Sequence, residues 1–189
     1  MIKAVILDCF GVLYVPVGED FYRSHLKNYD EVKDQLRELE YRSDLGQITQ
    51  EQLNERVAEI GGIDVDEVRK SIVGQYVRNK ALLNFAQSLR PKIKVALLSN
   101  INAESIDQFF SSDERNKFFD ASVISGEVGV AKPNPLIFEM VAQKLGVLPS
   151  ECVMVDDSGA HCDGAQEAGM KSVLFESTDG AISQINALL

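Results

Sequence analysis

Five short runs along the chain are apolar at most of their positions. Strands that are buried on both faces read as continuous apolar runs, so this pattern is typical of a parallel sheet covered by helices. We therefore predict an α/β fold with a Rossmann-like, doubly wound parallel sheet. The predicted strands are residues 4–7 (AVIL), 95–99 (VALLS), 121–125 (ASVIS), 152–155 (CVMV) and 172–175 (SVLF).

Helix signals separate these runs. Asn134 followed by Pro135 predicts the start of a helix, and Gly146 predicts its end. A second helix should end at Gly169. Further helices are predicted before the second strand and in the tail, over the stretches NKALLNFAQSLR (79–90) and AISQINALL (181–189).

More than eighty residues separate the first two runs, too many for one crossover connection. Most of them carry apolar stripes at helical spacing, and Thr49 and Gln52 are spaced as a capping box. We predict a helical insertion over residues 15–78 in a core made of residues 1–14 and 79–189. The three stripes are Val32, Leu36 and Leu39; Leu53, Val57 and Ile60; and Val68, Ile72 and Tyr76.

The net charge of the chain limits the classes of partner that we expect. The chain has 189 residues, a formal net charge of −10 and a pI near 4.7. Nucleic acids and anionic membranes both select a basic surface, so we expect neither as a partner. No segment reaches the length of a membrane span, which leaves a small molecule or a protein. The oligomeric state does not follow from the sequence.

The cysteines and the N-terminus bear on location. Cys9, Cys152 and Cys162 lack the spacing of a disulfide framework or a zinc site. The first residues enter a strand-like run directly, without the features of a signal peptide. We therefore expect a cytoplasmic protein.

Polar side chains follow three of the predicted strands where each strand ends. Asp8 follows the first run, Ser99 and Asn100 close the second, and the pair Asp156 and Asp157 follows the fourth. Ligands of open α/β sheets bind outside the carboxyl ends of the strands. Lys132 opens the segment before the helix that leads into the fourth strand. We expect these groups to meet at one edge of the sheet.

This set of side chains suits phosphate chemistry. Asp8 and Asp157 can hold Mg²⁺, which takes one or two carboxylates together with phosphate oxygens. Ser99 can donate to a phosphoryl oxygen, and Lys132 can offset its charge. Asp8 could then attack phosphorus and form an aspartyl-phosphate that water cleaves.

Four segments in order, DCFGVL, LLSN, AKPNPLIF and VDDS, resemble the four motifs of the haloacid dehalogenase superfamily. The insertion after the first motif resembles that superfamily's small helical type 1 cap, and GQITQEQL is similar to the caps of its sugar-phosphatase-like members. The resemblance implies a Mg²⁺-dependent phosphatase of a small phosphorylated metabolite. It makes Asp8, Ser99 and Lys132 the catalytic residues, with Ser99, Asn100 and Lys132 binding substrate. Its metal ligands would be Asp8, the backbone carbonyl of Phe10, Asp157 and, assisting, Asp156.

Phe10 departs from the superfamily's pattern. Most of its phosphatases have a second Asp there, which protonates the leaving oxygen and then deprotonates water. General acid–base assistance is worth ~10²–10⁴-fold, and phenylalanine supplies none. Active enzyme should therefore favour leaving groups that depart unprotonated, such as anomeric sugar phosphates, acyl phosphates or aryl phosphates, over alkyl esters.

Two other functions stay open. The metal-independent 2-haloacid dehalogenases have an aromatic residue at this place, but they tend to lack the acids of the fourth motif, which this chain keeps. A degenerate, non-hydrolytic member that binds a ligand is the other alternative. We expect His161, four residues past Asp157, to have a structural role rather than to bind the metal.

Overall fold

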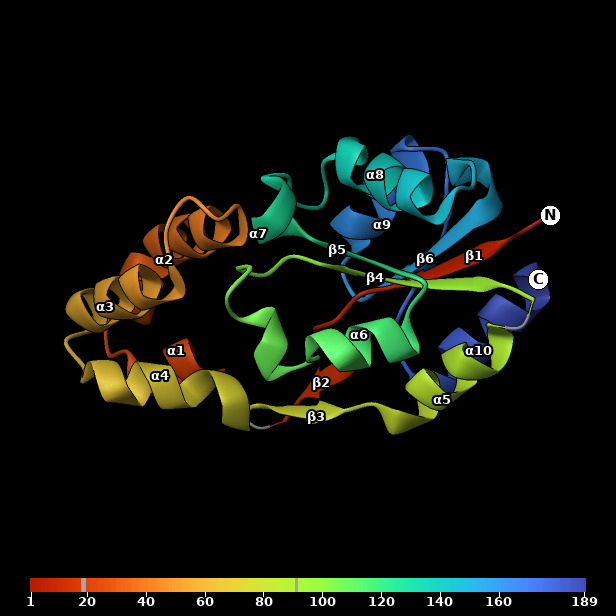
Figure 1. The fold of residues 1–189 in the computed structure, drawn as a ribbon. Helices are drawn as coiled ribbons and strands as arrows, with labels where there is room; N and C mark the ends of the chain where they lie inside the picture. The colour runs from red at the N-terminus through yellow and green to blue at the C-terminus, as the bar shows by residue number, and fades with distance from the viewer. Residues whose placement is uncertain (18–19, 91) are drawn as a thin grey trace.

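The computed structural model describes residues 1–17, 20–90 and 92–189, without the side chains of 72–74. Its centre is a five-stranded parallel sheet, ordered β5-β4-β1-β6-β7 (Figure 1). The predicted α/β fold is confirmed, and each strand lies within one residue of a predicted run. The strands are β1 (Ala4–Leu7), β4 (Lys94–Ser99), β5 (Ala121–Ile124), β6 (Cys152–Asp156) and β7 (Lys171–Leu174).

Helices cover both faces of this sheet (Figure 1). One face packs on α5 (Lys80–Leu89) and α10 (Thr178–Leu188), and the other packs on α8 (Pro135–Leu145) and α9 (Gly159–Glu167). Side chains of β1 alternate between these two cores, with Leu7 in the first and Ile6 in the second. Both are fully buried, which explains why the run is continuously apolar.

The predicted helix ends agree with the structure. Asn134 caps α8, Pro135 is its first residue, and Gly146 ends it in the left-handed conformation at φ +68°. Thr49 and Gln52 form the expected capping box at the start of α3. The remaining short helices are α6 (Ser112–Phe118), α7 (Ser125–Val128), η1 (Ile106–Gln108) and η2 (Pro149–Glu151).

Residues 21–74 form a separate group of helices, which we call the helical unit, beside one end of the sheet (Figure 1). It has its own core, in which Leu36, Val57 and Val68 are buried. Each such side chain contributes roughly 1.5–3 kcal/mol. The unit contains α1 (Phe21–His25), α2 (Tyr29–Asp44), α3 (Gln50–Gly61) and α4 (Val65–Gly74).

A two-stranded antiparallel ribbon joins the helical unit to the sheet. It pairs β2 (Tyr14–Pro16) with β3 (Tyr76–Arg78) and lies beside the expected boundaries at 14/15 and 78/79. The division into two domains at these residues stays a prediction. Arg78 fixes the ribbon through an ion pair with Glu114 at 2.7 Å.

One predicted stripe is partly wrong. The stripe of Val68, Ile72 and Tyr76 was expected on one helix, but α4 ends at Gly74 and Tyr76 lies in β3. The ring of Tyr76 packs on Phe10 of the core, and this contact favours the extended backbone of β3. The side chain of Ile72 lies outside the described residues.

Two further expectations concern cysteines and membranes. Cys9, Cys152 and Cys162 are all buried free thiols. Among the residues that the structure describes, no helix has both the length and the apolar character needed to cross a bilayer.

Candidate active site

The carboxyl end of β1 places Asp8 at the centre of the site. Leu7 is in register with Leu97 of β4 and with Val155 of β6. The Asp8 N–H continues the ladder by donating to the Val155 carbonyl at 3.0 Å. Asp8 is therefore level with Asp156, and the residue is only 5% exposed.

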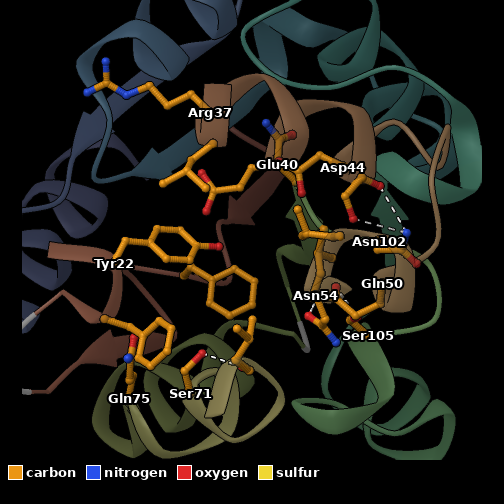
Figure 2. A pocket seen from close by; sticks show the side chains of 18 of the residues that line it. Tyr22, Arg37, Glu40, Asp44, Gln50, Asn54, Ser71, Gln75, Asn102 and Ser105 are labelled. Carbon is orange, nitrogen blue, oxygen red and sulfur yellow. Dashed lines mark hydrogen bonds between the residues drawn. The ribbon is translucent and has the colours of Figure 1, made fainter. Parts of the chain in front are cut away.

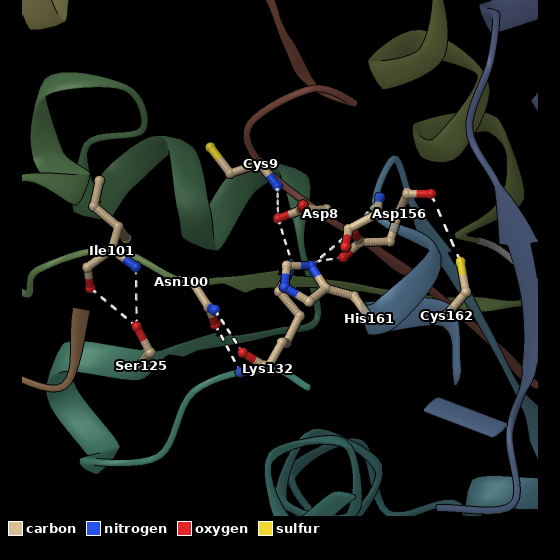
Figure 3. Close-up of polar contacts among 10 residues, drawn as sticks. Asp8, Cys9, Asn100, Ile101, Ser125, Lys132, Asp156, His161 and Cys162 are labelled. Carbon is tan, nitrogen blue, oxygen red and sulfur yellow. Dashed lines mark hydrogen bonds and ion pairs between the residues drawn. The ribbon is translucent and has the colours of Figure 1, made fainter. Parts of the chain in front are cut away.

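Lys132 is a buried cation between two carboxylates (Figure 3). Its Nζ lies 2.7 Å from Asp8 Oδ1 and 2.6 Å from Asp156 Oδ2, and the residue is 2% exposed. Asn100 holds its backbone at both ends. The Lys132 N–H donates to Asn100 Oδ1 at 2.8 Å, and Asn100 Nδ2 donates to the Lys132 carbonyl at 2.9 Å.

Asp156 has no free side-chain oxygen. Its Oδ2 pairs with Lys132, while Oδ1 accepts from the Ser158 N–H at 3.0 Å and lies 2.9 Å from His161 Nδ1. These contacts fix the carboxylate and, through it, the Lys132 ammonium (Figure 3). The structural role expected for His161 fits this contact.

Burial and neighbouring charge act in opposite directions on these groups. Burial, opposed by Lys132, raises the pKa of Asp8 to about 7, and the nearby charge of Asp156 adds to the rise. Burial also works against the charge on Asp156, but His161 and Lys132 outweigh it and lower that pKa to about 2. Burial favours neutral Lys132, yet the two carboxylates outweigh it and raise the pKa of the ammonium. Lys132 thus stays charged.

Ser99 ends β4, one strand away from Asp8, and is fully buried. Its hydroxyl lies beside the Cys9 thiol, and within the described part of the chain it makes no hydrogen bond. Leaving a buried hydroxyl unpaired costs about 1–3 kcal/mol. A ligand oxygen that accepted from Ser99 would offset this cost.

Asp157 reaches the loop that follows Asp8. A Cβ atom built on Gly11 would lie 2.0 Å from Asp157 Oδ2, and Gly11 has a φ of +80°. Only glycine satisfies both constraints. The carboxylate therefore lies directly against the backbone that follows Phe10.

The donor atoms here fit a hard cation. One ligand atom each from Asp8, Asp156 and His161 lies within 4.8 Å of the others, and Asp157 adds a further carboxylate nearby. Asp8 and Asp156 both contact Lys132, whereas Asp157 makes no ion pair with that lysine among the described residues. Oxygen donors in this number suit Mg²⁺.

Phe10 lies between the core and the helical unit. Its ring packs edge-on against Phe109, with centroids 4.7 Å apart, and against Tyr76 at 5.0 Å. These contacts hold an apolar ring where proton exchange would otherwise be expected. The packing explains the site's shape but offers no acid or base at this position.

A cavity of about 550 Å³ separates the helical unit from the core. The core side contributes Phe10 and Asn100, the immediate sequence neighbours of the cluster. The helical unit contributes Tyr22, Glu40 and Asp44, whose side chains are seen in Figure 2. A small organic molecule fits this volume.

The side chains of Asn102 and Ser105 fasten the helical unit to the core beside this cavity. Asn102 Nδ2 donates to the Ser43 carbonyl at 3.2 Å and to the Ile48 carbonyl at 2.9 Å. Ser105 Oγ donates to Gln50 Oε1 at 2.9 Å. The loop that follows Ser99 therefore holds the end of α2.

The structure brings Asp8, Lys132 and Asp156 into direct contact, and it places Asn100 on the Lys132 backbone. Ser99 and Asp157 lie at the ends of β4 and β6, the strands on either side of β1, and among the described residues neither makes a hydrogen bond or ion pair with Asp8 or Lys132. Sequence reasoning missed Asp44. Its only signal was its place at the end of an amphipathic segment, and its link to the core crosses 59 positions of sequence, between Ser43 and Asn102.

A family model described as haloacid dehalogenase-like hydrolase matches residues 2–169. The chain belongs to the haloacid dehalogenase-like hydrolases. Five parallel strands with helices on both faces are the fold of its solved relatives as well. The wild-type enzyme bt-2542 of Bacteroides thetaiotaomicron, solved with magnesium and inorganic phosphate, superimposes with a TM-score of 0.76 and 27% identity over 92% of this chain and 93% of that chain.

Relatives in this hydrolase family have different activities. D-ribitol-5-phosphate phosphatase of Bacteroides thetaiotaomicron is 25% identical over 96% of this chain and 94% of its own length. (S)-2-haloacid dehalogenase 4A of Burkholderia cepacia is 24% identical over 91% of this chain and 82% of its own length. N-acylneuraminate-9-phosphatase of Homo sapiens is 32% identical over 54% of this chain. The chain spans less than half the length of that phosphatase, at 41%.

Proposed function

We propose that this hydrolase is a Mg²⁺-dependent phosphatase of small phosphorylated metabolites and that Asp8 is its nucleophile. The observation that carries the proposal is the pairing of Asp8 with the buried, charged Lys132, one strand away from the Ser99 hydroxyl, which makes no hydrogen bond within the described residues. A carboxylate, a cation and a free donor are what phosphoryl transfer to a side chain requires. The magnesium and phosphate bound by bt-2542 support the same reaction class.

The phosphoryl group would bind between Ser99 and Lys132. The Ser99 hydroxyl donates to one phosphoryl oxygen, and the Lys132 ammonium neutralises another. Asn100 bonds to the Lys132 backbone through its Oδ1 and one of its two Nδ2 hydrogens, which leaves the second amide hydrogen for a phosphoryl oxygen. We therefore propose that Asn100 both positions Lys132, as Asp156 does, and helps to bind the substrate.

Mg²⁺ would be held by Asp8, Asp157 and the backbone carbonyl of Phe10, with Asp156 close by. It would supply positive charge to the phosphoryl oxygens and to the attacking carboxylate. The contact between Asp157 and Gly11 supports this set, since it brings the second carboxylate to the loop that carries the carbonyl.

The chemical steps fall to Asp8 and water. An Asp8 oxygen attacks phosphorus as the ester oxygen leaves, and water then cleaves the aspartyl-phosphate. Phe10 supplies no proton in either step. The ester must leave unprotonated, as aryl, acyl and anomeric sugar phosphates do, or take a proton from elsewhere in the cavity.

The helical unit, within residues 15–78, would act as a cap that selects the substrate. It supplies most of the cavity wall facing Phe10 and Asn100. We place the reaction in the cytoplasm, on a phosphorylated metabolite rather than on nucleic acid or a membrane. The net charge of −10 supports the exclusion of both polyanions.

One observation favours a second candidate, the 2-haloacid dehalogenase. An aromatic residue stands at position 10, and a dehalogenase is among the relatives. Halide displacement needs no metal, however, and in a dehalogenase Asp157 beside Gly11 would have no role as a metal ligand. This contrast favours the phosphatase.

The test is a panel of phosphate esters assayed with and without Mg²⁺, on the wild type and on Asp8→Asn. The phosphatase predicts turnover that requires the metal and is lost in the variant. Chloride release from a 2-halo acid without metal would establish the dehalogenase instead. If neither assay detects turnover, the result would favour a protein that only binds its ligand. Calorimetry would then measure its binding of inorganic phosphate.

A further inference from the structure

The proposed phosphatase lacks a proton donor at position 10, so we looked for one elsewhere in the cavity. The acidic side chains that line it are Asp20, Glu40 and Asp44. Of these, Asp44 directly follows Ser43, whose carbonyl accepts a hydrogen bond from Asn102 of the core. The inference below rests on the proposed function.

The position of Asp44 is fixed by its neighbours. It is the last residue of α2 and directly follows Ser43, which is 2% exposed and accepts from Asn102 at 3.2 Å. Asn102 is itself 4% exposed and lies three residues after Ser99. The Asp44 side chain thus lies on the same side of the cavity as Asn102, which belongs to the loop that follows β4 (Figure 2).

The surroundings of Asp44 keep it partly protonated near neutral pH. Burial, and then the charge of Glu40 one turn earlier on α2, raise the pKa of Asp44 to about 7. Lys132 and His161 oppose this rise and lower that pKa. A group with its pKa near the working pH can both give and take a proton.

We propose that Asp44 donates the proton to the leaving oxygen and then accepts one from water, in place of an acid at position 10. As the bond from an Asp8 oxygen to phosphorus forms, the bond from phosphorus to the ester oxygen breaks, and that oxygen takes the proton of Asp44. Water then attacks phosphorus and gives a proton to Asp44. The bond to Asp8 breaks, and both carboxyl groups return to their starting states.

The test compares two substrates in two variants. p-Nitrophenyl phosphate leaves without protonation, whereas glycerol 3-phosphate needs a proton. Asp44→Asn should lower kcat/KM for the alkyl ester ~10²-fold or more, and that for the aryl ester by less than ~10-fold. Asp34→Asn is the matched control, because Asp34 lies on the same helix, outside the cavity, with 85% of its side chain exposed. It should leave the ratio of the two constants unchanged.

A pH profile separates proton transfer from a merely structural role. For the alkyl ester, kcat/KM of the wild type should fall on the basic side as Asp44 ionises, and Asp44→Asn should remove that limb. Glu40→Gln should move the limb to lower pH, because the charge of Glu40 raises the pKa of Asp44.

Each failure has a distinct meaning. Equal loss of both substrates in Asp44→Asn, or an unchanged basic limb, would overturn the role of Asp44 and leave the phosphatase intact. Absence of Mg²⁺-dependent turnover of p-nitrophenyl phosphate in the wild type would overturn the proposed function, and the inference with it.

Discussion

Replacing Lys132 by Met should destabilise the protein far more than the loss of an ordinary surface lysine. The Lys132 ammonium lies 2.7 Å from Asp8 and 2.6 Å from Asp156, and its side chain is fully buried. At an effective dielectric constant of ~20, each ion pair is worth roughly 6 kcal/mol before desolvation. Burying the ammonium costs several kcal/mol, so removing one partner should lower the free energy of unfolding by about 3–5 kcal/mol.

This cost should depend on pH. The folded pKa of Asp8, about 7, exceeds its ordinary value of 3.8, so ionising Asp8 costs stability as pH rises between these two values. Without Lys132 the penalty is larger, because the lysine lowers that pKa. The loss of stability in Lys132→Met should therefore be greater at pH 8 than at pH 5, where Asp8 is neutral.

Urea unfolding followed by circular dichroism at both pH values measures the effect. Lys144→Met is the control, since Lys144 is exposed and, within the part of the chain that the structure describes, donates only to the Ser122 carbonyl at 2.7 Å. It should cost less than about 1 kcal/mol. If Lys132→Met cost no more than Lys144→Met, or cost the same at pH 5 and pH 8, the electrostatic account of the cluster would be wrong.

Three further variants test other parts of the site. Ser99→Ala should not destabilise the protein, because it removes a buried hydroxyl that has no partner among the described residues, and it should weaken inhibition by inorganic phosphate ~10-fold or more; unchanged inhibition would remove Ser99 from the phosphate site. Gly11→Ala should raise the Mg²⁺ concentration for half-maximal activity at least ~10-fold, because its Cβ would collide with Asp157, and an unchanged metal titration would contradict that placement. Asp44 has a raised folded pKa, so the wild type should lose up to about 4 kcal/mol of stability between pH 4 and pH 7 through this group. In urea unfolding, Asp44→Asn should not show this part of the loss of stability between pH 4 and pH 7. A pH dependence identical to that of the wild type would refute the raised pKa of Asp44.

The sheet was predictable because its strands are buried on both faces, and a run such as residues 4–7 has no polar position that could mislead. Asp8, Ser99 and Asp156 could be found as candidates because parallel strands end at the same edge. The predicted helical stripe ending at Tyr76 was partly wrong, because the three residues of β3 are too few to show the periodicity of a strand. Local spacing cannot show that a ring packs on Phe10 from across the chain.

The remaining features depend on contacts that no local pattern encodes. As an isolated segment, the stretch around Lys132 reads as a solvated loop, and only the folded chain shows the lysine buried between two acids. Asp44 needed the contact between Ser43 and Asn102 to be placed beside the strand ends. A carboxylate at the end of a helix otherwise looks like any surface acid.

The central claim is that Asp8 receives the phosphoryl group, and trapping the intermediate tests it most directly. The protein is mixed with p-nitrophenyl phosphate and Mg²⁺, quenched in acid within one turnover, digested with trypsin and analysed by mass spectrometry. The account predicts phosphate on Asp8 in the peptide of residues 4–23, and none in Asp8→Asn. Metal-dependent turnover that persists in Asp8→Asn, with no phosphate on that peptide, would contradict it.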